Sequence, residues 1–260
     1  MSKYARLNAL LELLTENGQL QVEQAADELD VSQATIRRDL DTLAEQQLLR
    51  RTHGGAVPNS TAYDLPLRYK TAKHAPEKRR IAEAAAEFVT AGAIIGASGG
   101  TTTTEVARVL ATRHDLQAAS APPVTLVTNA LNIAHELAIR PHIKLVVTGG
   151  VARQQSYELI GPLAREIPEQ IALDAMFLGV DAIDVHGGAC AHHEGEASIN
   201  RLMASRASQV IVVADSSKLA GQAFARICPI DEVDVLITDS GAAAGTTERF
   251  TQSGVRVILA

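Results

Sequence analysis

The residues best suited to chemistry follow short apolar segments in the C-terminal two thirds of the chain. They are Ser98, Gly99, Gly100, Thr101, Thr102, Thr103, Asn129, Gly149, Gly150, Arg153, Asp181 and Lys218. Glycine lets a backbone approach a ligand closely, while hydroxyls and the N–H groups at a helix start bind anions. The set therefore predicts a site for a phosphorylated sugar. We expect its phosphate on residues 99–103 with Lys218, and its hydroxyls near positions 129, 149–153 and 181.

Single members of this set are weak signals, because glycine, serine and threonine also end strands for reasons of turn geometry. For Thr128-Asn129 and Thr238-Asp239, turn geometry and ligand binding are equally good explanations of the residue types. Residues 99–103 are a stronger signal, since successive threonines are a poor start for a helix and anion binding gives a reason for them. Lys218 stands at a strand end and is expected to face the ligand crevice.

A second chemical signal lies near the N-terminus, in residues 31–43. Ile36, Leu40 and Leu43 fall on one side of a helix and would face a core. The polar residues lie largely away from that side and suit contacts with DNA bases or phosphates: Ser32, Gln33, Thr35, Arg37 and Arg38. Ser32 can also accept from the unpaired N–H groups of the first turn, which sets the helix start. We interpret this segment as a DNA-recognition helix.

The flanking segments complete a DNA-binding module. Helical spacing of apolar residues predicts two helices before the recognition helix, over residues 4–14 and 22–29. After it, residues 48–57 predict a strand, a tight turn and a partner strand. This hairpin is the wing of a winged helix-turn-helix, and it would carry Arg51 and His53 toward a phosphate backbone.

From residue 77 onward, apolar segments of strand length alternate with helical segments. Strands are predicted at residues 93–96, 124–127, 143–147, 175–180, 210–214, 233–237 and 255–259. Helices are predicted at residues 77–90, 104–111, 129–139 and 196–207. Continuous apolar strands separated by helices imply an α/β domain with a mainly parallel sheet covered on both faces. Ligands of such sheets bind beyond the carboxyl ends of the strands, where the first polar set stands.

The change of pattern predicts three parts of the chain. Residues 1–57 are the DNA-binding domain, and residues 77–260 are the effector-binding and oligomerisation domain. Residues 58–76, with three prolines and several basic side chains, are a linker. A solvated tether and a contact with DNA phosphate are equally compatible with this linker.

Composition narrows the class of protein. The 260 residues carry a net charge of −6, so a DNA contact would rest on local clusters such as Arg37 and Arg38. Aromatic residues make up 3% of the chain, which disfavours binding of single strands by stacking. Two cysteines without metal-type spacing and an N-terminus without an apolar signal core fit a reducing cytoplasm. No apolar run reaches the roughly 18 residues of a membrane span. No cofactor is expected.

The N-terminal and C-terminal motifs both resemble those of the DeoR family of bacterial transcription regulators, and the resemblance extends over nearly the whole chain. The N-terminal likeness consists of Val31-Ser-x-x-Thr-Ile-Arg-Arg-Asp-Leu40 and the wing Arg51-x-His-Gly-Gly55. The C-terminal likeness consists of Gly99-Gly-Thr-Thr-Thr103, Thr128-Asn129, Thr148-Gly-Gly150, Arg153, Gly161-Pro162, Phe177-Leu-Gly-x-Asp181, Glu196-Ala197 and Ala214-Asp-Ser-Ser-Lys218.

The resemblance implies a sensor domain similar in fold to ribose 5-phosphate isomerase and coenzyme A transferases. It also implies that sugar phosphates loosen a repressor from operators of sugar-catabolism genes. We therefore expect a cytoplasmic homo-oligomer that binds double-stranded operator DNA and is released by a phosphorylated sugar. Ser98 departs from the family, which often has Asp at this position, so no particular sugar is carried over.

Two alternatives stay open. One is a sugar-phosphate isomerase-like enzyme that carries a DNA-binding module, in which Asp181, Glu196 and Lys218 would move protons. The other is an architectural DNA binder whose C-terminal part only oligomerises. A metal site is not expected, because the histidines, cysteine and glutamate of residues 186–194 lack metal-type spacing. We predict a flexible loop near the ligand there.

Overall fold

The computed structural model describes residues 3–46, 48–58, 67, 73–118 and 121–260. It divides the chain into two compact units, Met1–Lys73 and His74–Ala260, each with its own hydrophobic core. The linker predicted over residues 58–76 falls largely on residues 59–66 and 68–72, which lie outside the described residues. The predicted domain boundaries therefore stay a prediction.

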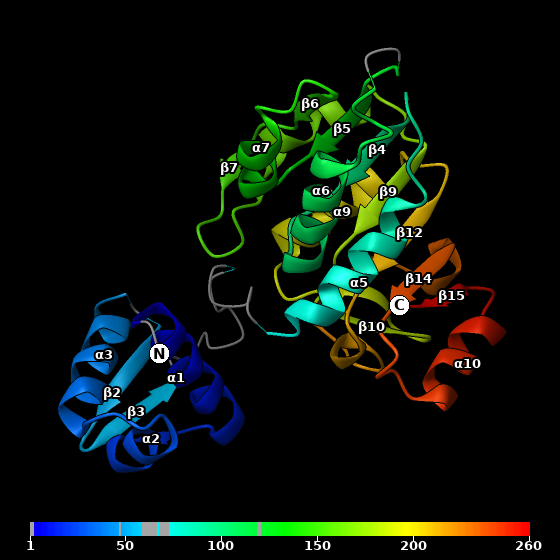
Figure 1. Ribbon diagram of the computed structural model, residues 1–260. Coiled ribbons are helices and arrows are strands. Elements are labelled where there is room, and N and C mark those ends of the chain that lie inside the picture. The colour runs from blue at the N-terminus through cyan, green and yellow to red at the C-terminus, as the bar shows by residue number, and fades with distance from the viewer. Residues whose placement is uncertain (1–2, 47, 59–66, 68–72, 119–120) are drawn as a thin grey trace. The chain divides into compact units, whose positions relative to one another are not determined.

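The N-terminal unit combines helices with a small antiparallel sheet (Figure 1). Its elements are α1 (Lys3–Asn17), β1 (Leu20–Gln21), α2 (Val22–Glu28), α3 (Gln33–Glu45), β2 (Leu49–Thr52) and β3 (Gly55–Pro58). The three helices and the wing are confirmed. Sequence reasoning missed β1, because two residues are too short for a period. It pairs Leu20 with Ala56 of β3 and so fastens the wing to the helices.

The C-terminal unit is built on a seven-stranded sheet of order β15-β14-β12-β9-β4-β5-β6, and all neighbouring strands are parallel (Figure 1). Its strands are β4 (Ile94–Ala97), β5 (Val124–Thr128), β6 (Ile143–Val147), β9 (Ala175–Leu178), β12 (Val210–Val213), β14 (Val235–Thr238) and β15 (Arg256–Leu259). The helices are α5 (Ala75–Ala86), α6 (Thr101–Thr112), α7 (Leu131–Leu137), α8 (Glu166–Glu169), α9 (Glu194–Ala204) and α10 (Ala244–Gln252). The predicted parallel α/β architecture is confirmed, with element ends shifted by a few residues.

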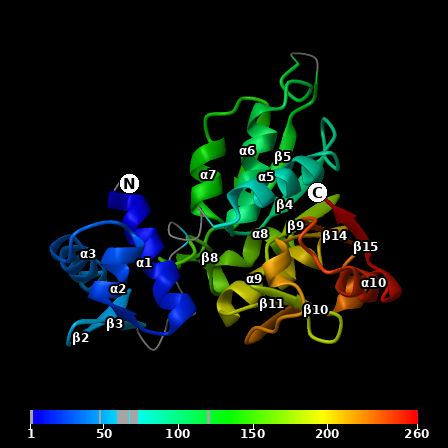
Figure 2. The same cartoon turned by 60° about the horizontal axis from the view of Figure 1, so that its bottom comes forward.

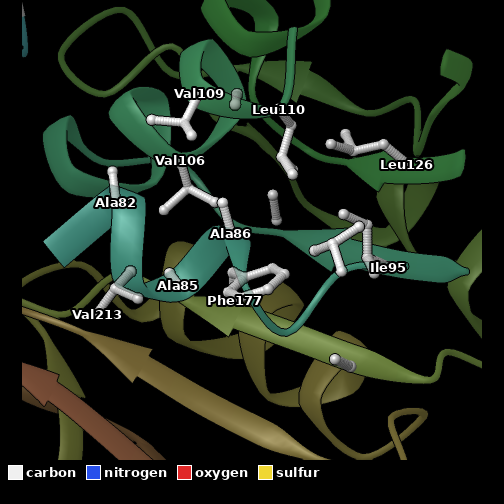
Figure 3. Packing of buried hydrophobic residues seen from close by; sticks show 14 of the residues in the cluster. Ala82, Ala85, Ala86, Ile95, Val106, Val109, Leu110, Leu126, Phe177 and Val213 are labelled. Carbon is white, nitrogen blue, oxygen red and sulfur yellow. The ribbon is translucent and has the colours of Figure 1, made fainter. Parts of the chain in front are cut away.

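Both faces of this sheet are buried. Figure 3 shows α5 and α6 packing over Ile95, Leu126 and Phe177, which come from three neighbouring strands. The next residues along the same strands, such as Met176 and Leu178, point the other way and join a second cluster that includes side chains of α9 and α10. Because the central strands β9, β12 and β14 are covered on both sides, their sequences consist of continuous rather than alternating apolar residues.

Shorter strands complete the C-terminal unit. They are β7 (Val151–Ala152), β8 (Leu159–Ile160), β10 (Ala182–Asp184), β11 (Gly188–Ala191) and β13 (Ala225–Cys228). The prediction of a flexible loop over residues 186–194 is wrong, because β11 is a buried strand between β10 and β13, and α9 begins at Glu194 (Figure 2). Small residues let the strands approach: a Cβ on Gly188 would lie 2.2 Å from the Cys228 carbonyl oxygen.

The direction of winding reverses between β4 and β9. The chain proceeds from β4 through β5 to β6 on one side, and from β9 through β12 and β14 to β15 on the other. Ligands of open α/β sheets bind at such a reversal, beyond the carboxyl ends of the strands. Among the described residues, no helix has both the length and the apolar character needed to cross a membrane.

Candidate functional site

The candidate DNA-binding surface is the solvent-facing side of α3. Its opposite side buries Ile36, Leu40 and Leu43 completely. Gln33, Arg37 and Arg38 are exposed, and the Arg37 guanidinium donates to Gln33 Oε1 at 3.3 Å. The predicted cap at Ser32 is confirmed, since its Oγ accepts from the Thr35 backbone N–H at 3.2 Å. The polar side chains that we assigned to DNA thus lie together on α3, and their contacts with DNA stay a prediction.

One polar residue of α3 faces inward. The Asp39 carboxylate is buried and forms an ion pair with Arg6 of α1. This pair fixes how α3 is rotated about its own axis, because turning the helix would separate two charges in a largely apolar setting. The exposed Arg37 and Arg38, which directly precede Asp39, therefore keep a defined direction.

The wing residues differ in their surroundings. His53 is exposed in the two-residue turn between β2 and β3. The Arg51 guanidinium instead donates to Asp41 Oδ1 of α3 at 2.9 Å and to the Gly55 carbonyl at 2.7 Å. Arg51 thus joins the wing to the recognition helix. Its predicted contact with DNA phosphate stays a prediction.

The candidate effector site begins at the reversal between β4 and β9. The Ser98 hydroxyl is buried, accepts from the Gly179 backbone N–H at 2.9 Å and donates to the Gly99 carbonyl. A Cβ on Gly179 would lie 2.9 Å from that same carbonyl oxygen, so the two strand ends touch through their backbones. Ser98 therefore holds the strand ends together, and its place in the effector site stays a prediction.

The helix start after β4 offers backbone donors. Gly100 caps α6 at φ 130°, and the first helical bond is donated by Thr104 N–H to the Gly100 carbonyl at 3.1 Å. The N–H groups before Thr104 precede this bond and suit an anion. The hydroxyls of Thr103 and Thr104 donate to the same Gly100 carbonyl, and the side chains of residues 102–104 are buried. Buried packing thus explains most of the threonine run, and the side chain of Thr101 alone is partly exposed.

The glycines after β6 serve close packing as well. Gly149 and Gly150 have φ values of 79° and 118°, which favour glycine. A Cβ on Gly150 would lie 2.8 Å from the Ala164 side chain, whereas one on Gly149 would meet only the Leu163 carbonyl at 3.5 Å. Gly149 is exposed, so it is the one of the two that a ligand could approach.

A buried polar cluster lies beside this loop and centres on Glu158. Asn129 Nδ2 donates to Glu158 Oε2 at 2.8 Å, and Asn200 Nδ2 donates to the same oxygen at 3.1 Å. The backbone of Glu158 bridges antiparallel to Ala130, which holds the carboxyl under the end of β5. A Cβ on Gly99 would lie 2.3 Å from Glu158 Cγ, so only glycine allows this approach. Asn129 belongs to the predicted set, whereas Glu158 and Asn200 do not.

Charged side chains surround Glu158. Arg153 donates to Glu196 Oε1 at 3.0 Å, and both side chains are 9% exposed. Asp181 Oδ2 accepts from the His192 backbone N–H at 2.9 Å. Burial, and then the charge of Glu196, raise the pKa of the Glu158 carboxyl to about 8, although the two amide donors act in the opposite direction. Glu158 is therefore mostly protonated at neutral pH.

Lys218 ends a short helical turn after β12. The turn is fixed by Asp215, whose Oδ1 accepts from the Ser217 N–H, and by Asp239, which accepts from the Ser216 N–H and hydroxyl. The Lys218 side chain is partly exposed and has no side-chain partner among the described residues. No interaction joins it to the loop at Gly100, so its place in the effector site stays a prediction.

The metal-capable residues of positions 186–194 are dispersed by the fold. Cys190 is buried in β11, and the His193 ring accepts from the Gly195 N–H as the cap of α9. In the part of the chain that the structure describes, no group of three His, Cys, Asp or Glu side chains could hold a metal ion.

The sequence contained a signal for Asn200, which we missed. Asn200 lies four residues after Glu196 in α9, on the same face as the apolar Ile199 and Met203. Polar residues at this spacing within an apolar face indicate a buried polar cluster rather than a solvated surface. Glu158 likewise stands directly before the apolar pair Leu159-Ile160.

Comparison with known proteins assigns both units. The chain matches the model of the DeoR-like helix-turn-helix domain over residues 6–62 and that of the DeoR C terminal sensor domain over residues 73–240. It is 35% identical over 254 residues to the HTH-type transcriptional regulator GlpR of Haloferax volcanii, with 97% of this chain and 96% of the relative covered.

The chain is also 30% identical over 259 residues to the glycerol-3-phosphate regulon repressor of Escherichia coli K12, with both chains covered completely. A solved structure, ribose 5-phosphate isomerase A of Methanocaldococcus jannaschii, aligns with 57% of this chain and 56% of its own, at 19% identity and a TM-score of 0.42. That alignment is too distant to bear on activity. The two family models match successive parts of the chain, and these relatives match over nearly their full length. The chain therefore belongs to the DeoR family of transcriptional regulators.

Proposed function

We propose that this chain is a cytoplasmic repressor of carbohydrate catabolism genes, released from its operator by a phosphorylated sugar or polyol. The observation that carries the proposal is the exposed row Gln33, Arg37 and Arg38 on a helix whose other side is completely buried. Exposed arginines on a helix of this module suit bidentate contacts with guanine in the major groove. One relative is named the glycerol-3-phosphate regulon repressor, and this name supports a phosphorylated effector for the present chain.

The effector is proposed to bind at the reversal between β4 and β9. Its phosphate would meet the N–H groups at the start of α6 and the Lys218 ammonium, and its hydroxyls would meet the cluster around Asn129 and Arg153. Release requires that the ligand bind more tightly to an arrangement of the sensor that holds the DNA-binding helices at the wrong spacing.

We propose that the chain is not an enzyme. The carboxylates that the isomerase alternative needs already have partners, since Glu196 is paired with Arg153 and Asp181 accepts from the His192 N–H. Turnover of a pentose or hexose phosphate by the purified full chain would contradict this part of the proposal.

The experiment that tests the repressor proposal starts from an operator selected from a random DNA library by the full chain. Fluorescence anisotropy then follows DNA release on addition of glycerol 3-phosphate, ribose 5-phosphate, a hexose 6-phosphate, or inorganic phosphate as the control. We expect one phosphorylated compound to raise the Kd for DNA at least tenfold while inorganic phosphate does not. Failure to enrich any DNA, or failure of every phosphorylated compound to release it, would refute the proposal.

A further inference from the structure

Two polar atoms at the centre of the buried cluster lack a hydrogen-bond partner among the described residues. Asn129 is completely buried, and its Oδ1 has no partner although its Nδ2 serves both Glu158 and Asn200. In Glu158, Oε2 accepts two amide N–H groups while Oε1 accepts none. Asn129 Oδ1 is fully buried, and a buried polar atom without a partner is unfavourable. Together with the unused Oε1 of Glu158, it points to a bound group that hydrogen-bonds to both atoms.

The free carboxyl oxygen lies next to the loop where an effector would bind. A Cβ on Gly99 would be 2.6 Å from Glu158 Oε1, so the loop backbone rests directly on this oxygen. The Asn129 amide belongs to the same cluster, because its nitrogen bonds to the other oxygen of the same carboxyl group. The cluster thus lies against the reversal point between β4 and β9.

The charged side chains around Glu158 influence whether its carboxyl group is protonated or ionised. Glu196 approaches from α9 and Asp181 from the end of β9, and both raise the pKa of Glu158. Arg153 is the nearby cation, but it is paired with Glu196. The neutral acid carries one proton, and the two amide donors on Oε2 leave Oε1 as the place for it.

We propose that Glu158 and Asn129 form a hydroxyl-reading subsite of the effector site, in which neutral Glu158 donates from Oε1 to an alcohol oxygen of a phosphorylated polyol and the same alcohol donates to Asn129 Oδ1. One alcohol satisfies both atoms, because a hydroxyl is a donor and an acceptor. Ionised Glu158 would offer a second acceptor in place of the donor and would repel the phosphate. The subsite therefore binds its ligand only with Glu158 protonated. This inference rests on the proposed phosphorylated effector.

The test is calorimetric titration of the full chain with glycerol 3-phosphate, a small phosphorylated polyol, at pH 7 and pH 9. Phosphate monoesters have a second pKa of about 6, so the ligand keeps its charge over this range. The neutral fraction of a carboxyl falls about tenfold per pH unit above its pKa, so the Kd of the wild-type chain should rise about tenfold. Glu158→Gln keeps a donor and an acceptor without titrating, and its Kd should be the same at both pH values.

A matched control is Glu248→Gln, the same chemical change on an exposed residue of α10. It should show the wild-type rise in Kd. A wild-type Kd that is equal at pH 7 and pH 9 would overturn the inference and leave the proposed function standing. If glycerol 3-phosphate does not bind, the titration is repeated with ribose 5-phosphate and a hexose 6-phosphate, and failure of all three would refute the proposed function together with the subsite.

A second readout does not need a ligand. Infrared difference spectra between pH 7 and pH 9 should contain a carboxylic acid C=O band that disappears at the higher pH in the wild-type chain. This band should be absent from the Glu158→Gln difference spectrum and present in that of Glu248→Gln. Identical spectra for the wild type and Glu158→Gln would show that Glu158 is not the neutral acid, and the inference would fail.

Discussion

Arg37 and Arg38 are the residues of α3 from which we expect the strongest effect on DNA binding. Each guanidinium is exposed and can form a bidentate contact. We predict that Arg37→Ala or Arg38→Ala weakens operator binding by about 1–3 kcal/mol, since a bidentate base contact contributes about this much. Anisotropy with the selected operator measures the change. Arg249→Ala, an exposed arginine of α10, is the control, and normal affinity of both α3 variants would contradict the assignment of α3.

Glu158 makes the stability of the chain depend on pH in a direction opposite to that of most carboxylates. Its pKa is raised from 4.5 to about 8 in the folded state, first by burial and then by Glu196. Its contribution to stability is complete below pH 4.5, and it decreases as the pH rises to about 8, because the unfolded chain releases the proton more readily. We predict that Glu158→Gln unfolds at a higher temperature than the wild type at pH 9.

The size of this difference follows from the linkage. A shift of one pKa unit corresponds to about 1.36 kcal/mol, so removal of the titrating group should stabilise the fold at pH 9 by several kcal/mol, on the order of 10–20 °C in Tm. At pH 5 the advantage should nearly vanish. Melting followed by circular dichroism at both pH values is sufficient, and an equal Tm difference at pH 5 and pH 9 would show that the carboxyl does not titrate as described.

Lys218 has no side-chain partner within the described residues and is the predicted cation for the effector phosphate. We predict that Lys218→Ala keeps wild-type affinity for operator DNA but needs at least tenfold more ligand for release, because a charged hydrogen bond contributes roughly 1.5–3 kcal/mol. Lys144→Ala, which removes an exposed lysine of β6, serves as the matched variant. Release of the Lys218 variant at the wild-type ligand concentration would remove this residue from the site.

The polar residues of the effector site could be predicted from sequence as a group, but their individual roles could not. The sequence predicts that Ser98, Thr103 and Asn129 follow strands, and all three do. Whether such a side chain faces a ligand or a neighbouring backbone group depends on packing between strands distant in the sequence. The Ser98 hydroxyl, which accepts from the Gly179 N–H, is an example. Glu158 escaped prediction because its environment comes from residues 29 and 42 positions away.

At the scale of elements, the wing and the recognition helix are joined by Arg51 and Asp41. The pair is largely exposed, so it contributes no more than about 1 kcal/mol. If Arg51 acts by holding the wing, Asp41→Asn and Arg51→Ala should each weaken DNA binding by up to about fivefold, and the double variant should be no weaker than Arg51→Ala alone. Anisotropy on the three variants measures this. Tighter binding by Asp41→Asn would instead indicate that Arg51 is held back from a phosphate.

The strands of the parallel sheet were predictable, and the small antiparallel strands were not. Most parallel strands contain several consecutive large apolar residues, as in the fully buried β9, β12 and β14, so their signal is local. The strands β7, β8, β10 and β11 have two to four residues, and their pairing is set by contacts across the fold. The hairpin of β10 and β11 contains glycine, alanine and cysteine, whose small side chains give no strand period.

For the whole molecule, we predict a homo-oligomer in solution. A repressor of this kind reads two half-sites about one helical turn or a multiple apart, so it needs two recognition helices. Light scattering coupled to gel filtration should give a mass that is a multiple of the single chain, and footprinting should give a protected site with two-fold symmetry. A monomeric chain that protects a single half-site would contradict this prediction.

The buried pair of Arg6 and Asp39 gives the two sides of α3 separate roles, because one side orients the helix and the other side is exposed for DNA. The side that sets the orientation is anchored to α1, whereas Gln33, Arg37 and Arg38 carry no part of that anchorage. Exchange of these three side chains should therefore redirect the regulator to other operators without redesign of its scaffold. Libraries that randomise the outer side and keep Asp39 are expected to yield folded proteins with new promoter preferences, which would make this chain a practical starting point for synthetic gene circuits.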